Sequence, residues 1–267
     1  MIFDDPLPKI SCLTVTAKGR FAMLEKSVQC YLDQTYSNKE LIIVSDGDSE
    51  YQSKIKDSFS RNDIKLIFLK GEYSLGSLRN ISIACCEGDL FVQWDDDDFN
   101  MPERLAVQFH HLKNNSQCKV SFLSDQLHYY ISNSQIYWED WKKFHNGGVT
   151  KYSLIPGTIM AWSDKFSYRY PNAKLGEDSF ISDLFCKSNE SEICLLSGYG
   201  YLQVYSFHGQ NAWDIDHHLD ISKCRSKYVQ EILPYQKQIC GVLDYLKFNG
   251  TVSVCGRDGL AFTHEVL

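Results

Sequence analysis

The stretch 91-FVQWDDDDFNMPERL-105 places four consecutive aspartates directly behind an apolar run that predicts a buried strand at 90–94. Four like charges at one strand end repel one another, so an ordinary loop has no reason to concentrate them. A solvated turn, in which Asn100 caps a helix that starts near Met101, accounts for Asn100. One cap needs only one short polar side chain, so this interpretation leaves Asp95 to Asp98 unexplained.

The bulk composition is that of a globular protein with one sizeable core, or of one domain with an appendage. The 267 residues are 43% hydrophobic and carry a net charge of −7 without a basic block, which argues against nucleic acid as the main partner. The ten cysteines show no CxxC pair and no zinc-like spacing, as expected for free thiols in a reducing compartment. No signal-peptide pattern and no membrane-span-length apolar run is evident. We therefore expect a cytoplasmic protein, or one that rests peripherally on a membrane.

Strand-like and helix-like patterns alternate over the first 100 residues. Strands are predicted at 10–16, 40–45, 64–69 and 90–94, and helices at 21–34, 50–61 and 75–86. Such alternation implies an α/β fold in which right-handed crossovers join parallel strands and helices cover both faces of the sheet. In sheets of this kind, ligands bind outside the carboxyl ends of the strands.

The pattern loosens beyond Pro102. We predict a helix at 102–113, a strand at 120–127, an irregular aromatic-rich stretch at 129–148, strands at 158–162 and 201–207, and a helix at 177–187. The chain from 222 to 248 is expected to be helical with an interruption at Pro234, because proline cannot continue a helix interior. Residues 249–259 are predicted to form either a small hairpin or a tail.

Three predicted strands deliver acids and small polar groups to one edge of the sheet. Thr16 to Arg20 follow the first strand, Asp46 to Asp48 follow the second, and the four aspartates follow the fourth. Each group alone fits ordinary turn chemistry, but their coincidence favours a binding site. Clustered carboxylates suggest Mg²⁺ or Mn²⁺, because both ions prefer oxygen ligands. In an extended chain, Asp95 and Asp97 would point to one side, and Asp96 and Asp98 to the other.

The order of these segments resembles the family 2 glycosyltransferases, which are inverting enzymes with the GT-A fold, a Rossmann-like nucleotide-binding sheet flanked by helices. The matching stretches are ISCLTVT, SVQCYLDQTYSNKELIIVSDGDS, LGSLRNISIACCEGDLFVQWDDDDFNMPERL, GEDSFISDLF and HGQNAW. The resemblance covers roughly residues 8 to 215 and is specific over the first half. It implies a GT-A domain at 1–220, with a nucleotide-sugar-binding half at about 8–115 and an acceptor half at about 116–220. Residues 221–267 are expected to form a C-terminal helical extension.

The activity that this resemblance implies is the transfer of a sugar from a nucleotide diphosphate donor, commonly a UDP-sugar, to a hydroxyl of a glycan or lipid-linked glycan. It implies that Asp46 holds the uracil ring, that Thr16 is the polar residue after the first strand, and that Arg79 lies near the diphosphate. For Arg79, an arginine on a helix surface is an equal alternative. The loop after the first strand reads Val-Thr-Ala-Lys where the family usually has Pro-Thr-Tyr-Asn. The resemblance therefore defines the nucleotide base of the donor less well than it defines the metal site.

The metal site implied by the resemblance consists of the DxD pair and a late histidine. Asp95 matches the residue that meets the ribose, or the metal through water, and Asp97 matches the direct ligand of Mn²⁺ or Mg²⁺. Asp96 fills the variable position between them and is grouped with the nucleotide-binding residues. His208, in 207-FHGQNAW-213, resembles a histidine that completes the metal shell in part of the family. The alternative for His208 is an ordinary surface or core histidine.

Glu177 and Asp178, in 175-LGEDSF-180, resemble the acidic pair that begins a helix beneath the acceptor in this family. An inverting transfer needs one carboxylate to take the proton of the acceptor hydroxyl. We assign this role to Asp178, with Glu177 as the second choice. The alternative is that an acid only caps the helix and complements its dipole.

Three other functional classes stay open. A sugar-1-phosphate nucleotidyltransferase normally has a basic Gly-rich phosphate loop after its first strand, of which 16-TAKGR-20 is a poor version. An aspartate-nucleophile phosphatase has its acidic pair after the first strand, whereas the cluster here follows the fourth. A non-catalytic glycosyltransferase-like binding module has no need to retain the DxD pair, the acidic pair and the late histidine together.

Overall fold

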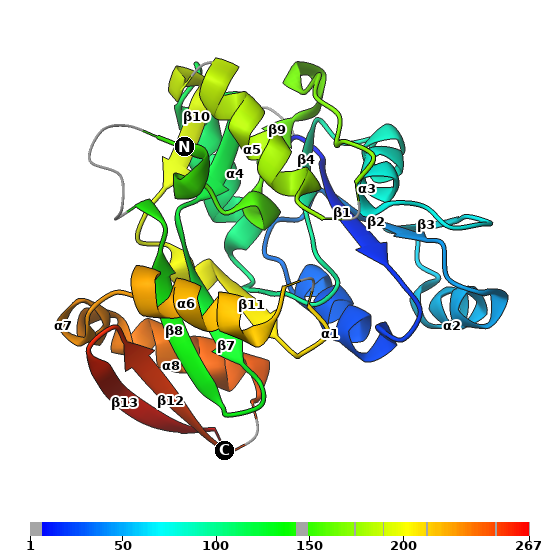
Figure 1. Cartoon of the computed structure of the whole chain (residues 1–267). Coiled ribbons are helices and arrows are strands. Elements are labelled where there is room, and N and C mark those ends of the chain that lie inside the picture. Colours follow the sequence, from blue (N-terminus) through cyan, green and yellow to red (C-terminus); the bar gives the residue numbers. More distant parts are fainter. Residues whose placement is uncertain are drawn as a thin grey trace.

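Two β-sheets and the helices that cover them form the fold (Figure 1). The computed structural model describes residues 7–142, 149–173, 175–188, 190–211, 213–248 and 250–266. Within these ranges, the strand order is β10-β6-β9-β4-β1-β2-β3 in a seven-stranded sheet and β13-β12-β8-β7-β11-β5 in a six-stranded sheet. The chain crosses between the two sheets several times, so neither sheet is a separate stretch of sequence.

The seven-stranded sheet contains the four strands predicted over the first 100 residues. Its members are β1 (Ile10–Thr16), β2 (Lys39–Ser45), β3 (Ile64–Phe68), β4 (Leu90–Gln93), β6 (Val120–Leu123), β9 (Met160–Trp162) and β10 (Ile193–Leu196). The strands β4, β1, β2 and β3 are parallel, and β9 runs antiparallel between β4 and β6. The carboxyl ends of β1, β2 and β4 therefore share one edge, as the sequence predicted.

Helices cover both faces of this sheet, which explains why its strands are apolar at nearly every position. The helices are α1 (Phe21–Leu32), α2 (Ser49–Phe59), α3 (Leu75–Ala84), α4 (Arg104–Asn114) and α5 (Glu177–Ser188). Side chains of α1, α2 and α4 share one hydrophobic cluster with Cys12 and Ile43 of the sheet. Side chains of α3 and α5 share the other cluster with Leu13 and Val44. Alternate residues of one strand thus face opposite helical layers.

The six-stranded sheet is assembled from the rest of the chain. Its strands are β5 (Phe99–Asn100), β7 (Asp125–Tyr130), β8 (Gln135–Asp140), β11 (Gln203–Phe207), β12 (Gly250–Gly256) and β13 (Gly259–Val266), and its helices are α6 (Ile215–Arg225), α7 (Val229–Ile232) and α8 (Gln236–Leu246). Figure 1 shows α6 in front of β7 and β8, with α8 behind them. Leu127 and Trp138 belong to the hydrophobic cluster that includes α8 residues, while His128 and Glu139 bond on the α6 side. The sheet therefore has one apolar face and one polar face, and both are covered.

Short 3-10 helices complete the described chain. They are η2 (Lys151–Ser153), η3 (Pro156–Thr158), η4 (Ser163–Lys165), η5 (Glu190–Glu192), η6 (Gly200–Leu202) and η7 (Leu233–Tyr235). The last of these contains Pro234, where the sequence predicted an interruption between helices. No helix among the described residues is long and apolar enough to cross a membrane.

Several predictions for the second half of the chain are wrong. The strand expected at 120–127 is broken at Ser124, where the chain passes from β6 in one sheet to β7 in the other. The stretch expected to be irregular at 129–148 contains the β7–β8 hairpin, and its residues 143–148 lie outside the described chain. The extension at 221–267 is helical only as far as α8. Its end forms the β12–β13 hairpin, which was one of the two alternatives for residues 249–259 and joins the six-stranded sheet through β8.

The predicted cap of the fourth helix is also wrong. Helix α4 begins at Arg104, after Glu103, which makes no side-chain capping bond. Asn100 instead lies in β5, and its Oδ1 atom accepts a hydrogen bond from the Arg104 guanidinium. The polar side chain therefore anchors a buried arginine, because Arg104 is fully covered and needs acceptors.

Gly76 in the first turn of α3 provides a test of this packing. A Cβ atom at Gly76 would collide with the carbonyl oxygen of Pro171, whereas a Cβ at Gly241 in α8 meets no atom within 4 Å. We expect Gly76→Ala to lower the free energy of unfolding by roughly 1–3 kcal/mol through overpacking. The matched control Gly241→Ala is expected to raise it by about 0.4–1 kcal/mol. Urea unfolding measures both, and equal effects of the two substitutions would contradict the packing of α3 on residue 171.

Candidate functional site

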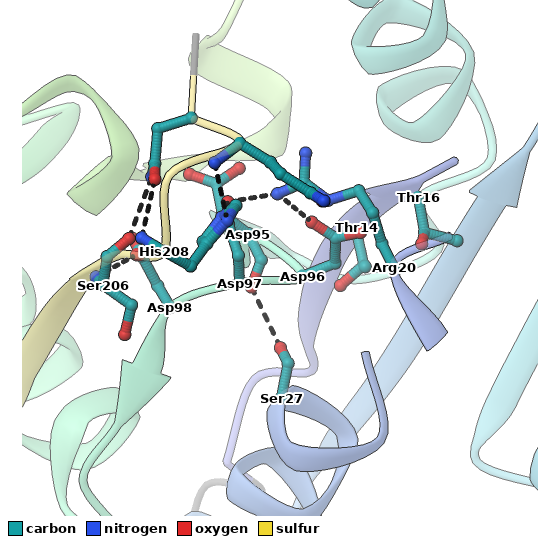
Figure 2. A network of polar contacts seen from close by, with 12 residues as sticks. Thr14, Thr16, Arg20, Ser27, Asp95, Asp96, Asp97, Asp98, Ser206 and His208 are labelled. Carbon is teal, nitrogen blue, oxygen red and sulfur yellow. Dashed lines mark hydrogen bonds and ion pairs between the residues drawn. The ribbon is translucent and has the colours of Figure 1, made fainter. Parts of the chain in front are cut away.

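The four aspartates occupy the connection between β4 and β5, where the chain leaves one sheet for the other. A turn at residues 96–97 breaks the extended backbone, so the condition for a strict alternation of the side chains is not met. Arg20, just before α1, pairs with both Asp96 and Asp97, and its Nη2 atom lies 3.1 Å from Asp96 Oδ1 (Figure 2). The single positive charge of the guanidinium is therefore shared between two of the four carboxyl groups.

His208 joins the cluster from the loop after β11. Its Nε2 atom lies 3.1 Å from Asp97 Oδ2, and its side chain is buried (Figure 2). Burial opposes the ionisation of Asp97, but the hydrogen bond from His208 and the charge of Arg20 outweigh it and lower the pKa of Asp97. The structure thus brings together two of the three residues that the sequence assigned to a metal, Asp97 and His208, which lie 111 positions apart.

The other three aspartates, Asp95, Asp96 and Asp98, lie in surroundings that disfavour their ionised forms. Burial, and next the charge of Asp97, raise the pKa of Asp96 to about 8 and that of Asp98 well above its ordinary range. Burial also raises the pKa of Asp95, against the opposing charge of Arg79. Asp98 accepts hydrogen bonds from Gln203 Nε2 at 2.9 Å and from the Ser206 backbone at 3.3 Å, so it fastens the turn to β11. These raised pKa values show that the surroundings disfavour the ionised forms of Asp95, Asp96 and Asp98, and a cation bound beside them would favour ionisation.

Arg79 of α3 is buried, so the interpretation of Arg79 as a helix-surface residue is wrong. Its Nη2 atom lies 3.4 Å from Asp95 Oδ1, and its Nε atom lies 3.3 Å from Glu177 Oε1. Its guanidinium also lies over the ring of Tyr170, 5.4 Å from the ring centre. Arg79 therefore links the aspartate cluster to the acidic pair at the start of α5.

The two acids of that pair differ in their surroundings. Glu177 is only 2% exposed, and burial raises its pKa although the charge of Arg79 opposes the shift. Asp178 is half-buried and lines a cavity of about 440 Å³, and Asp95 lines the same cavity. Glu177 is not among the residues of the cavity wall. The geometry therefore makes Asp178, rather than Glu177, the acid that a ligand in the cavity meets.

Thr16 and Asp46 lie at the carboxyl ends of β1 and β2, as expected. The Thr16 hydroxyl is buried and lies 2.7 Å from the hydroxyl of Tyr51. Asp46 Oδ2 accepts a hydrogen bond from the Tyr73 backbone at 3.1 Å. Both residues thus have protein partners, and their roles toward a nucleotide stay predictions.

The donor set at the cluster suits Mn²⁺ or Mg²⁺ in its chemistry. Asp97 and His208 converge, Asp95 lies in the same turn, and carboxylate oxygen with an imidazole nitrogen is a set that Mn²⁺ accepts. Among the residues that the structure describes, no group of three or more His, Cys, Asp or Glu side chains is placed so that it could hold a metal ion. An ion held by so few protein ligands keeps positions for water and phosphate oxygens, as Mg²⁺ sites commonly do.

Sequence reasoning gave no role to two parts of this site. The sequence predicts Arg20 only as a loop residue. Its place after the first strand, at the sheet edge that also carries the four aspartates, is the signal that could have identified it. The cavity wall formed by β7, β8 and α6 was missed entirely, because β8 was predicted to be irregular. On that wall, Glu139 is fully buried and accepts hydrogen bonds from His128 and Ser222, both at 2.7 Å.

Comparison with known proteins adds sequence relatives. The model of the family described as glycosyl transferase family 2 matches residues 12–170, which is more than half of the chain. An uncharacterized glycosyltransferase of Methanocaldococcus jannaschii is 27% identical over 125 residues, which are 46% of this chain and 43% of the relative. The putative glycosyltransferase EpsE of Bacillus subtilis is 29% identical over 111 residues, 40% of this chain and 36% of EpsE. The chain thus matches less than half the length of these curated relatives.

Solved structures resemble the fold. The crystal structure of S. aureus TarS 1-349 in complex with UDP-GlcNAc aligns with a TM-score of 0.58 at 14% sequence identity, covering 89% of this chain and 71% of that one. A second crystal structure of S. aureus TarS 1-349 aligns with a TM-score of 0.57 and covers 89% of this chain and 80% of that chain. The α/β fold of GT-A type that the sequence predicted is confirmed by this likeness.

His218 on the cavity wall makes stability depend on pH. Burial, and next the nearby His128, lower the pKa of His218 to about 4. An unfolded histidine titrates near pH 6.5, so between pH 6.5 and 4 the unfolded chain binds more protons than the folded chain. The contribution of neutral His218 is therefore present above pH 6.5 and lost as the pH falls toward 4. We expect the parent to lose about 1–3 kcal/mol more unfolding free energy between pH 7 and pH 4 than His218→Asn does.

Urea unfolding across this pH range measures the difference. His110, which is exposed on α4, provides the matched control, and His110→Asn is expected to keep the pH dependence of the parent. A His218→Asn protein whose stability falls as steeply as that of the parent contradicts the lowered pKa.

Proposed function

This chain belongs to glycosyl transferase family 2, and we propose that it is a metal-dependent inverting glycosyltransferase that uses a nucleotide diphosphate sugar. A UDP-sugar is the proposed donor, and a hydroxyl of a glycan or lipid-linked glycan is the proposed acceptor. The observation that carries the proposal is the convergence of Asp97 and His208 at the carboxyl edge of the sheet, beside a cavity that both Asp95 and Asp178 line. The UDP-GlcNAc bound to the structural neighbour TarS supports this donor class.

The aspartate turn is the proposed place of the donor diphosphate. Asp97 and His208 would hold Mn²⁺ or Mg²⁺, which supplies Lewis-acid neutralisation of the charge on the leaving diphosphate. Arg79 adds a fixed positive charge beside Asp95. Asp46, at the end of β2, is the proposed partner of the base, and Thr16 the polar residue beside it. These residues bind and orient the donor at the edge where α/β sheets bind ligands.

The proposed base is Asp178. It takes the proton of the acceptor hydroxyl while the hydroxyl oxygen attacks the anomeric carbon, and the bond from that carbon to the diphosphate oxygen breaks on the opposite side. The sugar is thereby transferred with inversion. Glu177 instead holds Arg79 through their ion pair, so its carboxylate is engaged below the cavity.

The loop 16–20 argues against a sugar-1-phosphate nucleotidyltransferase. Such an enzyme needs basic residues after the first strand that are available to a triphosphate. Here Lys18 Nζ lies 2.6 Å from Asp48 Oδ2, and Arg20 pairs with Asp96 and Asp97. Both cations are engaged with acids of the protein, which supports the transferase instead.

Asp97→Asn tests the donor site, because it keeps the shape of the side chain and removes the charge. We expect Mn²⁺-dependent UDP binding to weaken at least tenfold and metal-dependent release of UDP from nucleotide sugars to fall at least 100-fold. Calorimetry with UDP, with and without Mn²⁺, measures the first effect. A screen of nucleotide sugars and nucleoside triphosphates, read by the nucleotide released, measures the second and identifies the donor.

The control for this experiment is Asp220→Asn on the exposed surface of α6, which is expected to behave like the parent. The metal assignment fails if Asp97→Asn binds UDP with the same enhancement by Mn²⁺ as the parent. Release of pyrophosphate from a triphosphate by the parent, with no release of UDP, supports the nucleotidyltransferase instead.

Asp178→Asn tests the base separately from the donor site. Among the described residues, Asp178 makes no ion pair with Arg79, and it is not one of the proposed metal ligands, so UDP binding is expected to stay within about threefold of the parent. Turnover of the donor is expected to fall by about 10²–10⁴-fold, the usual contribution of a general base. Undiminished turnover in Asp178→Asn, measured on the donor found in the screen, moves the base to another residue.

A further inference from the structure

One oxygen atom of Asp97 has two partners. Arg20 Nη2 contacts Asp97 Oδ2, and His208 Nε2 lies 3.1 Å from the same oxygen (Figure 2). Asp97 and His208 are the proposed metal ligands, whereas Arg20 brings a positive charge of its own. A guanidinium has five N–H donors and no acceptor, so it binds the carboxylate but cannot ligate an ion. Arg20 therefore takes a place on Asp97 that a divalent ion also needs.

Among the described residues, a single nitrogen holds the guanidinium of Arg20. Nη2 makes both contacts, with Asp97 Oδ2 and, at 3.1 Å, with Asp96 Oδ1. An arginine that is fixed on a carboxylate often uses two nitrogens in a fork, which gives the more specific, bidentate pair. Arg20 Nε is buried and has no hydrogen-bond partner in the described part of the chain. The contact thus lacks the second bond that would fix the guanidinium in place.

Arg79 is held more firmly than Arg20. The side chain of Arg79 is 7% exposed, compared with 29% for Arg20. Arg79 pairs through two different nitrogens, Nη2 with Asp95 and Nε with Glu177, and its guanidinium lies over the ring of Tyr170. Arg20 is therefore the arginine that can release a carboxylate and move toward solvent.

Helix α1 does not depend on the Arg20 side chain for its position. Ser27 Oγ donates to the backbone carbonyl of Asp95 at 2.9 Å, and Trp94 Nε1 donates to the carbonyl of Ser27 at 3.1 Å. These two bonds hold α1 on the aspartate turn when the guanidinium leaves Asp97.

A divalent ion and the guanidinium compete for Asp97 because both are cations. At equal separation, their repulsion is twice that of two unit charges. Arg20 keeps its contact with Asp96 Oδ1 when it leaves Asp97, because a carboxyl oxygen accepts a hydrogen bond whether or not the group is ionised. This gives Asp96, which lies between the two aspartates of the DxD pair, a role as the second partner of Arg20.

We propose that Arg20 is an internal competitor of the divalent ion at Asp97 and keeps the affinity of the protein for the ion alone low. The ion then binds together with a nucleotide diphosphate, whose phosphate oxygens add ligands. Arg20 returns to Asp97 when the diphosphate leaves. The proposal rests on the proposed function, because it takes Asp97 as a metal ligand. Arg20 is a positioning residue, since it acts through Asp97.

Arg20→Gln tests the competition with Mn²⁺ alone as the probe. Glutamine keeps a hydrogen-bond donor but has no charge, so the repulsion of the ion is lost. We expect the affinity for Mn²⁺, measured without nucleotide by electron paramagnetic resonance of the free ion, to rise roughly fivefold or more. Arg20→Lys restores a positive charge at this position and is expected to bind Mn²⁺ within about twofold of the parent.

Arg61→Gln is the matched control. Arg61 lies before β3, at the edge of the sheet away from the aspartate turn, and pairs with Asp63 at 2.9 Å. The same loss of one charge is expected to leave the Mn²⁺ affinity within about twofold of the parent, because salt screens distant exposed charges. A rise in Arg61→Gln as large as that in Arg20→Gln assigns the effect to net charge and overturns the proposal.

Labelling of the parent with phenylglyoxal, which modifies guanidinium groups, needs no variant at Arg20. Mn²⁺ is expected to raise the rate of Arg20 labelling about twofold or more, because it shifts the guanidinium away from Asp97. Arg61 in the same sample is expected to keep its rate. Mass spectrometry of the labelled peptides measures both residues, and this measurement decides if Arg20→Gln does not fold.

The proposal is overturned if Arg20→Gln binds Mn²⁺ no more tightly than the parent, if Arg20→Lys binds it as tightly as Arg20→Gln, or if Mn²⁺ leaves the labelling of Arg20 unchanged. The metal assignment itself is measured separately, by the Mn²⁺-dependent UDP binding of Asp97→Asn. A parent that binds Mn²⁺ and UDP through Asp97, with Arg20→Gln behaving like the parent, contradicts only the competition. A parent that binds no Mn²⁺ with or without UDP contradicts both proposals.

Discussion

Repulsion among four carboxylates in one turn is the constraint that the rest of this site depends on. Two like charges 4 Å apart at a protein surface repel by about 4 kcal/mol, so the turn cannot form without compensation. Compensation comes from Arg20 before α1, Arg79 on α3 and His208 after β11. These three partners belong to distant parts of the sequence. Their contacts with the aspartates therefore hold three distant segments in fixed relative positions.

The position of the turn gives this conflict a wider consequence. The chain leaves the seven-stranded sheet at the end of β4 and enters the six-stranded sheet at β5, and a second crossing at Ser124 leads from β6 to β7. Asp98 bonds to β11 at the first crossing. The acidic edge of one sheet and the polar face of the other therefore meet where the chain changes sheets. The cavity lies at this meeting, and Asp95 and His128 line it from the two sheets.

The first 100 residues could be predicted because their signals are local. Parallel strands covered on both faces are continuous apolar runs, and the strands at 10–16 and 64–68 are found within a residue of the predicted bounds. The aspartates could be assigned to an edge for the same reason. The β7–β8 hairpin could not, because its polar face is buried under α6 by contacts with distant residues, such as that of Glu139 with Ser222, 83 positions away. The pairing of His128 with Glu139 is likewise a result of strand register that no short pattern reveals.

The carboxyl groups on the two sides of the cavity differ in how well their surroundings stabilise the ionised form. At the aspartate turn, burial raises the pKa values of Asp95, Asp96 and Asp98, so their ionised forms are disfavoured in the free protein. At the opposite wall, Glu139 is fully satisfied by its neighbours, and its role is to orient them. A carboxylate at the centre of a hydrogen-bonded network fixes the orientation of its neighbours Gln126, His128 and Ser222, and thereby makes this wall rigid.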